Sequence, residues 1–254
     1  MRCIDLNCDL GEGAGHDAEL MLFITSANIA CGGHAGDTAT MRASVALARQ
    51  HGVAVGAHPA FNDREHFGRR ELPLEATEVA VLVGTQIQAL QEIAFDLGTA
   101  VRHVKLHGAL YNMASRDRTL AESIVRILRM TAKEPMLFVL AGSELERVAR
   151  TYDDVHVVAE AFADRTYQAD GTLTPRSRPD ALIQDEDTAV AQVLRMVREG
   201  RVRATDGTEV PVRADTICVH GDGPHAVAFA RRLARELRQC GIELRAPAGR
   251  PTGT

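Results

Sequence analysis

Short β-prone apolar runs alternate along the chain with longer segments of helical period. The β-prone runs occupy 3–7, 27–30, 53–57, 101–106, 136–140, 155–161 and 216–220. The helical segments, in which apolar residues recur every three or four positions, are 37–51, 77–97, 117–132, 185–199 and 223–239. About seven strand-then-helix units predict a parallel sheet covered by helices.

A closed barrel is favoured over an open doubly wound sheet. The first strand is followed by "LNCDLGEG", which carries carboxylates and lacks the GxGxxG turn of a dinucleotide-binding sheet. We therefore expect an α/β fold with an irregular seven-stranded, TIM-like β/α barrel, formed by residues 1–254 as one domain. Thr77 and Asp117 are expected to cap their helices.

Two segments interrupt the alternation. Residues 201–213 place Asp206-Gly207 between β-prone flanks, which predicts a small surface hairpin. Residues 164–180 form a long connection rich in Pro, Gly and Asp, and such loops in compact domains are usually lids or binding loops.

Composition and charge narrow the class of protein. The chain has 254 residues, 45% of them hydrophobic and 25% charged, as in ordinary soluble enzymes. A net charge of -5 without a basic block argues against nucleic-acid or acidic-membrane partners. The first ten residues contain carboxylates, and no run of eighteen apolar residues exists, so neither a signal peptide nor a membrane span is expected. Five scattered cysteines are typical of reduced thiols, so we expect a cytoplasmic protein.

Polar residues gather where the predicted strands end. In α/β barrels, the carboxyl ends of the strands carry the active site. Four of the ten histidines follow a strand directly or after a short turn: His34, His58, His107 and His220. Asp5, Asn7, Asp9 and Glu12 follow or end the first strand, and Lys105, Tyr111, Glu160, Asp164 and Arg165 belong to later ones. The sequence therefore predicts a polar pocket at one mouth of the barrel.

Each residue taken singly has a plainer interpretation. A lone histidine is as often structural as catalytic, Asp37 is placed to cap the next helix, and Glu12 is compatible with an ordinary loop. Asp5 alternates with apolar residues and would face the barrel interior, where an unpaired carboxylate is costly. We expect it to pair with a cation such as Lys105 or to reach the ligand. Cys31 is interpreted as a small buried residue rather than as a nucleophile.

The residue types leave two kinds of chemistry open. Imidazoles and carboxylates can hold a divalent metal, although HExxH is absent and the histidines are far apart in sequence. The same groups can act as general acids and bases while Lys105 and the arginines hold anionic oxygens. Neither a GxSxG elbow nor a Walker phosphate loop is present.

Six ordered motifs resemble the LamB/YcsF family, which is the family of the 5-oxoprolinase A-subunit. They are "DLNCDLGEG", "SANIACGGHAGD", "GAHPAFNDREHFGRRE", "VKLHGALYN", "FADRTYQADGTL" and "CVHGD". The resemblance implies a seven-stranded barrel related to polysaccharide deacetylase-like barrels. It also implies ATP-dependent opening of 5-oxo-L-proline to L-glutamate, with Mg²⁺ accompanying ATP and with partner subunits B and C. Gly33 and Leu106 stand where phenylalanine and proline are common in this family.

Charge and position suggest roles for the residues of these motifs. The expected catalytic residues are Asp5, Asp9, His34, His58, His107, Glu160 and His220. The expected substrate- or phosphate-binding residues are Asn7, Asn28, Lys105, Tyr111, Asn112, Asp164, Arg165, Arg176 and Asp222. The sequence does not determine whether a metal ion is bound.

Two other functions remain open at this point. One is a stand-alone, metal-dependent amide or carbohydrate deacetylase on a similar barrel. The other is a non-catalytic subunit that only binds substrate or partners. A chelator should abolish deacetylase activity, whereas lactam opening should depend on ATP and the other subunits.

Overall fold

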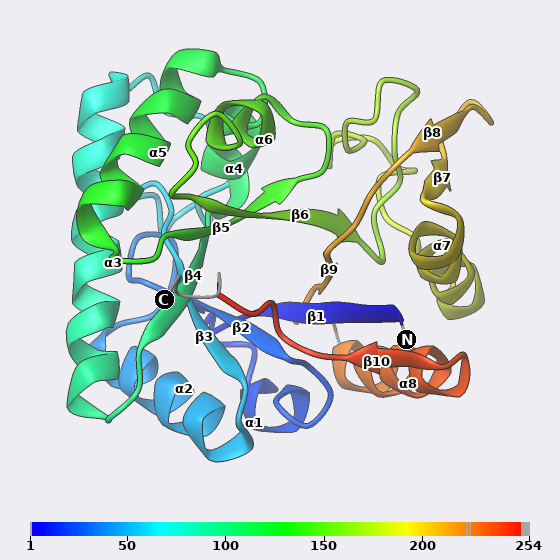
Figure 1. The fold of residues 1–254 in the computed structure, drawn as a ribbon, viewed down its shortest axis with the longest axis horizontal. Helices are drawn as coiled ribbons and strands as arrows, with labels where there is room; N and C mark the ends of the chain where they lie inside the picture. The colour runs from blue at the N-terminus through cyan, green and yellow to red at the C-terminus, as the bar shows by residue number, and fades with distance from the viewer. Residues whose placement is uncertain (1, 222, 224, 250–254) are drawn as a thin grey trace.

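Seven parallel strands close into a barrel in the computed structural model, which describes residues 2–221, 223 and 225–249 (Figure 1). The barrel strands are β1 (Arg2–Leu10), β2 (Ser26–Ala30), β3 (Ala54–His58), β4 (Val101–Lys105), β5 (Met136–Leu140), β6 (His156–Phe162) and β9 (Thr216–Val219). Each pairs in parallel with the next, and β9 pairs with β1 to close the ring. All seven coincide with the predicted β-prone runs to within a few residues, which confirms the barrel.

The barrel is irregular between β6 and β9. The long connection of residues 164–180 lies there and makes isolated bridges from Arg165 to Leu182 and from Tyr167 to Leu173. It leads into α7 (Glu186–Glu199) and then into the antiparallel pair β7 (Arg201–Arg203) and β8 (Glu209–Pro211). This pair lies beside α7, away from the barrel (Figure 1).

Helices surround the barrel on its outside (Figure 1). Besides α7, the long ones are α2 (Thr38–His51), α3 (Ala76–Asp96), α5 (Arg118–Thr131) and α8 (Ala226–Gln239). The short ones are α1 (Asp17–Leu20), α4 (Gly108–Ala114) and α6 (Glu144–Ala149), and β10 (Ile242–Leu244) adds to the start of β1.

The helix caps follow local hydrogen bonding. The Asp37 and Asp117 carboxylates accept backbone N–H groups at the starts of α2 and α5, as expected. The prediction for Thr77 is wrong. Glu75 is the cap of α3, because Glu75 and Glu78 form reciprocal side-chain to backbone bonds.

The apolar core lies between the barrel and the helices, and the barrel interior is polar. On β1, Leu6, Cys8 and Leu10 belong to the buried apolar layer, whereas the alternating Asp5 and Asn7 bond to polar groups of neighbouring strands. Because side chains alternate between the two faces of a strand, the same sequence supplies both layers.

A glycine on β3 makes room for a large side chain inside the barrel. A Cβ added to Gly56 would come within 2.0 Å of His103 Nε2, so only glycine fits beside the imidazole. The His103 ring stacks on Phe138 at a centroid distance of 4.1 Å. The ring therefore occupies a site prepared by both neighbouring strands.

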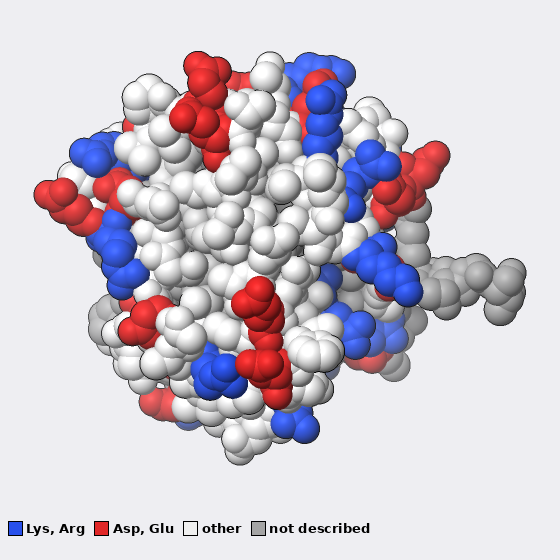
Figure 2. All heavy atoms as spheres, turned by 90° about the vertical axis from the view of Figure 1, so that its left-hand side faces the viewer, with Lys and Arg blue, Asp and Glu red and all other residues white. Residues whose placement is uncertain are grey.

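The large apolar side chains with the highest exposed fractions, among the described residues, lie on the outer face of α3 and α5. Val81 and Phe95 on α3 and Met130 on α5 are 66%, 82% and 82% exposed. Figure 2 shows this face, on which charged side chains border a broad uncharged area. Among the described residues, no helix combines the length and apolarity needed to cross a bilayer.

Candidate active site

A buried hydrogen-bonded network links the strands near the carboxyl end of the barrel. Its members are Asn7, Asp9, Asn28, His103, Lys105 and Glu160. The Asn28 amide donates to Asn7 Oδ1 and to Asp9 Oδ1, each at 2.8 Å. Asn7 in turn donates to Glu160 Oε1 at 3.0 Å. The network thus joins residues that are far apart in sequence.

Lys105 is the buried cation of this network. Its Nζ lies 2.9 Å from Asp9 Oδ1 and 2.9 Å from Glu160 Oε1, and it donates to Cys218 Sγ at 3.1 Å. Burial opposes its charge, but Asp9 and the other neighbouring anionic groups hold the pKa of Lys105 well above its usual range. Its protons are directed at protein groups. This placement suits Lys105 to position the carboxylates, and it differs from the expected contact with an anionic ligand.

The two carboxylates beside Lys105 have different surroundings. Burial opposes the charge of Asp9, but His58 and Lys105 hold the pKa of this carboxyl well below its usual range. Glu160 is fully buried and accepts the Tyr111 hydroxyl at 2.7 Å. Asp9, whose side chain is 11% exposed, is therefore the carboxylate nearer to solvent.

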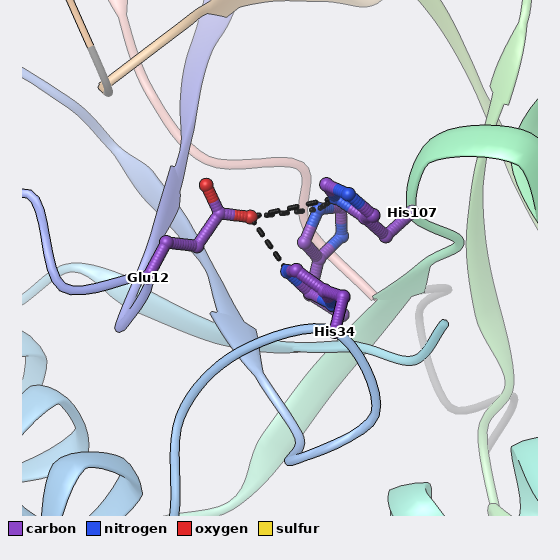
Figure 3. Close-up of side chains that lie close together, drawn as sticks. Glu12, His34 and His107 are labelled. Atoms are coloured by element: carbon purple, nitrogen blue, oxygen red, sulfur yellow. Dashed lines mark hydrogen bonds and ion pairs between the residues drawn. The ribbon is translucent and has the colours of Figure 1, made fainter. Parts of the chain in front are cut away.

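Three histidines and a glutamate meet above this network (Figure 3). Glu12 Oε1 lies 2.7 Å from His34 Nε2, 3.4 Å from His107 Nδ1 and 3.9 Å from His58 Nε2. The His34 and His107 rings stack with centroids 3.6 Å apart. His58 Nε2 also lies 3.4 Å from Asp9 Oδ2, which connects the cluster to the network below.

Backbone carbonyls fix the ring orientation of two of these histidines. His58 Nδ1 donates to the Lys105 carbonyl at 2.8 Å, and His107 Nε2 donates to the Phe67 carbonyl at 3.0 Å. Because a carbonyl only accepts, these ring nitrogens carry protons. The other two, His58 Nε2 and His107 Nδ1, face each other at 2.9 Å. They can share one proton or direct lone pairs at one cation.

The charge states of the histidines differ because of their neighbours. Burial, together with the charges of His58 and His34, lowers the pKa of His107 well below its usual range. Burial also lowers the pKa of His34. It opposes charge on His58 too, but Asp9 raises the pKa of His58. Without another cation, His58 is therefore the imidazole that holds the proton.

Loops after β2 and β3 place the cluster. Gly36 has a φ of +77° where an added Cβ would lie 3.1 Å from the Ala30 carbonyl, so this turn requires glycine. Phe67 has a φ of +54°, which is strained for a non-glycine residue, and its ring packs edge-on against His34 and His107. The strained residue covers the histidines and supplies the carbonyl that orients His107.

Gly33 stands where phenylalanine is common in the family that the motifs resemble, and the packing around it explains the small residue. A Cβ added there would meet the Ala60 carbonyl and Gln86 Oε1, each at 2.8 Å. Gln86 donates to that carbonyl at 2.7 Å and accepts from Ala60 N at 3.0 Å. In this chain the space beside Gly33 is thus filled by a glutamine from α3.

A second polar cluster lies at the ends of β6 and β9. His220 Nδ1 donates to Asp164, whose two oxygens are each 2.8 Å away, and His220 Nε2 accepts from the exposed Arg176 at 2.8 Å. The Phe162 ring stacks on His220, and Lys105 Nζ lies 5.5 Å from the same ring. Phe162 therefore separates this cluster from the buried network at the same mouth.

A cavity of about 350 Å³ opens beside the histidines. Glu12, His34 and Phe67 line it. A larger cavity of about 660 Å³ lies at the opposite, amino end of the strands, between the starts of β1 and β6. Because the histidines and carboxylates converge at the carboxyl end, the smaller cavity is the one at the candidate active site.

Three of the expected site residues have side chains that face other protein groups or solvent, and a fourth lies outside the described residues. Asp5 is 1% exposed and accepts hydrogen bonds from three hydroxyls, those of Thr25, Ser26 and Thr216, rather than pairing with Lys105. Burial raises the pKa of Asp5 to about 6. It lies below the site and stabilises strand pairing.

The other three are in the loops and in α4. The buried Arg165 guanidinium donates to the carbonyls of Ala181 and Thr174, so it holds the 164–180 connection together instead of facing a ligand. Asn112 is on the exposed side of α4. Asp222 lies outside the described residues. The other expected residues, apart from Arg176 on its loop, are in or beside the two clusters.

Sequence reasoning undervalued two residues. Glu12 lies in a sequence typical of an ordinary loop, and its partners follow or end three other strands, so the local sequence does not distinguish it. His103 lies inside strand β4, two residues before Lys105, and was not among the expected site residues. The strand period, which puts positions 103 and 105 on one face, is the signal that could have found it.

We expect His103 to make the protein sensitive to acid. Burial lowers the pKa of this imidazole from 6.5 to about 3 in the folded state. Between these pH values the unfolded chain binds a proton that the folded chain does not, so stability falls as the pH falls. The slope is about 1.4 kcal/mol per pH unit. Other groups, such as Asp5, also contribute to the pH dependence, so the difference between two proteins isolates His103. Urea unfolding between pH 4 and 6.5 should show a slope in the wild type that exceeds the slope in His103→Gln by up to about 1.4 kcal/mol per pH unit.

The exposed His51 provides the control for this measurement. His51→Gln should leave the slope unchanged, because the His51 side chain is exposed in the folded protein. An unchanged slope in His103→Gln would contradict the assignment of a neutral, buried His103.

Comparison with known proteins identifies the family. The sequence pattern of the LamB/YcsF family matches residues 4–251. The chain belongs to the LamB/YcsF family. Family members named as the A-subunit of 5-oxoprolinase are 51% identical in Bacillus licheniformis, covering 97% of this chain and 99% of that protein, and 48% identical in Neisseria meningitidis serogroup B, covering 97% and 100%.

Solved structures confirm the barrel. The lactam utilization protein from Thermus thermophilus has a TM-score of 0.90 and 46% identity, covering 97% of this LamB/YcsF chain and 100% of that one. A putative cellobiose-phosphate cleavage protein from Enterococcus faecalis V583 has a TM-score of 0.59 at 15% identity, covering 96% of each chain. A family 4 carbohydrate esterase from Streptomyces lividans has a TM-score of 0.50 at 13% identity, covering 96% and 91%. At these low identities the last two show the fold alone, which is the expected relation to deacetylase-like barrels.

Proposed function

We propose that this chain is the A-subunit of a 5-oxoprolinase, which opens 5-oxo-L-proline to L-glutamate with ATP cleavage, together with subunits B and C. The observation that carries the proposal is the likeness of 48–51% over 97% of the chain to proteins named for this role. Because those proteins are named as one subunit of an enzyme, the likeness also supports a complex of several different chains.

The chemistry explains why ATP would be needed. A five-membered lactam is an amide closed by its own chain, so its hydrolysis gains little entropy. Transfer of the γ-phosphoryl group to the lactam oxygen activates C5, and ADP leaves. Water then adds to C5, and loss of the ring nitrogen gives an acyl phosphate. A second water releases phosphate and L-glutamate. ATP, with Mg²⁺, is a co-substrate of the assembled complex in this scheme.

The site offers groups for these steps. Asp9 and the histidine cluster at the mouth are placed to accept protons from attacking water or to donate one to the leaving nitrogen. Arg176 is exposed and donates to His220, and its guanidinium could bind a carboxylate or phosphate. Lys105 and His58 keep Asp9 ionised, and the Asn28 amide donates to Asp9 and holds it in position.

Reconstitution tests the proposal. The chain should be combined with subunits B and C, 5-oxo-L-proline and Mg-ATP, and L-glutamate and ADP should be measured together. We expect both products in equal amounts and neither after omission of this chain or of ATP. Absence of glutamate from the complete mixture would contradict the proposal. Chelator-sensitive release of acetate from acetylated sugars by the chain alone would support a deacetylase instead.

A further inference from the structure

We infer that Glu12, His34, His58 and His107 form a binding site for one divalent first-row transition-metal ion at the mouth of the barrel. The four residues belong to the loops that follow four successive strands, β1 to β4, or to their last residues. The inference about binding stands on their geometry and does not depend on the proposed function.

The spacing of the four donor atoms fits one ion. One ligand atom from each residue lies within 4.8 Å of all the others. The separations of 2.7, 3.4 and 3.9 Å from Glu12 Oε1 bracket the value of about 3.3 Å that tetrahedral zinc sites require, given bonds of about 2.0–2.1 Å. Three imidazoles and a carboxylate are also the ligand types that zinc and its neighbours prefer.

The hydrogen bonds behind the cluster orient lone pairs toward its centre. The Lys105 and Phe67 carbonyls each accept a proton from the outer nitrogen of a histidine, His58 and His107 respectively. Histidines that ligate metals usually donate their other ring N–H to such a group. The two inner nitrogens face each other 2.9 Å apart, so at least one of them needs a proton or a metal ion between or beside the pair.

The cluster is fixed before any ion arrives. The His34 ring is stacked on His107 and packed edge-on against His58 and Phe67. All three imidazoles are buried, and the Glu12 side chain is 8% exposed. The three rings have little freedom to lose on binding. The stacked His34 and His107 rings must tilt for their in-plane lone pairs to meet at one ion.

The cavity gives the ion an open side. Glu12 and His34 belong to the cluster and also line the cavity of about 350 Å³, so a small molecule could reach an ion held there. An ion with an accessible position can polarise a carbonyl or bind and acidify water. This role in lactam opening rests on the proposed function, whereas the binding itself does not.

Titration of the isolated full-length chain with Co²⁺ tests the site. The chain is first freed of metal with a chelator, and the visible absorption of bound Co²⁺ then reports both stoichiometry and coordination. We expect one equivalent to bind with the intense bands of a four- or five-coordinate N/O site, and Zn²⁺ to displace it. His34→Ala and His107→Ala should each weaken binding by more than about a hundredfold, beyond the effect of losing an outer partner of a ligand.

Two further variants make the result decisive. His51→Ala, which removes an exposed histidine at the end of α2, should bind Co²⁺ like the wild type. Glu12→Gln keeps the size of the side chain, and should weaken binding at least tenfold, by about the factor expected for a perturbed ligand set. If the histidine variants do not fold, Co²⁺ binding by Glu12→Gln tests whether the cluster holds the ion.

The inference is overturned if the folded wild type binds no stoichiometric Co²⁺ or Zn²⁺, which would mean that a shared proton is the only cation of the cluster. Equal binding by the wild type and by folded Glu12→Gln and His34→Ala would overturn it too. Because no nucleotide, lactam or partner subunit is present, either result leaves the reconstitution test of lactam opening independent.

Discussion

Replacing Lys105 by methionine is expected to lower the free energy of unfolding by about 3–5 kcal/mol, the usual effect of removing one partner of a buried ion pair. The ammonium group lies 2.9 Å from both Asp9 and Glu160. Without it the buried Glu160 loses its ammonium partner, while Asp9 keeps His58 nearby, so uptake of a proton by Glu160 becomes favourable. Urea unfolding at neutral pH measures the loss.

The chain provides a matched control, because its only other lysine, Lys133, is exposed. Lys133→Met should change stability by less than about 0.5 kcal/mol, as surface substitutions usually do. Adding Glu160→Gln to Lys105→Met should recover part of the lost stability, since it removes one uncompensated charge. Equal stabilities of Lys105→Met and Lys133→Met would contradict the role of Lys105 as the cation of the network.

Replacing His107 by alanine is expected to reduce glutamate formation by the reconstituted complex by more than about a hundredfold, the usual scale for loss of a group that moves protons. His107 is the histidine that joins the others, since it stacks on His34, faces His58 Nε2 and lies 3.4 Å from Glu12. The measurement is the initial rate of glutamate release at saturating 5-oxo-L-proline and ATP.

Folding must be checked separately, because the substitution leaves a small cavity and an unpaired carbonyl at Phe67. Thermal unfolding and assembly with subunits B and C should therefore be measured for each variant. His51→Ala should retain wild-type turnover. Normal turnover by a folded, assembled His107→Ala variant would contradict a catalytic role for His107. Normal turnover after substitution of both His107 and Asp9 would indicate a subunit that only binds substrate or partners.

Much of the fold could be predicted because strands and helices each leave a local pattern of apolar and polar residues in the sequence. Each barrel strand is a short apolar run followed by a loop, and each long helix carries an apolar face that packs on the barrel or on a neighbouring helix. The helix caps were less predictable. Thr77 has the right side chain for a cap, but the reciprocal bonds of Glu75 and Glu78 start α3 before it.

The location of the candidate site could be predicted from the sequence, but the role of each residue in it could not. The rule that polar residues after barrel strands meet at one mouth located both clusters. It could not tell Arg165, which is turned inward to hold two carbonyls, from Arg176, which faces solvent and His220. The two residues have the same chemistry and lie on the same connection, so only their burial separates them.

The sequence by itself determined the alternation of strands and helices and the placement of histidines and acids after the strands. Those features depend on residues close together in the chain. Only the tertiary structure decided that Glu12 reaches His34, His58 and His107, and that Asp5 is held by hydroxyls. These contacts depend on the pairing of β1 with β2 and β9 and on backbone carbonyls that turn each imidazole. Distances set by strand register and ring orientation leave no periodic signal in the sequence.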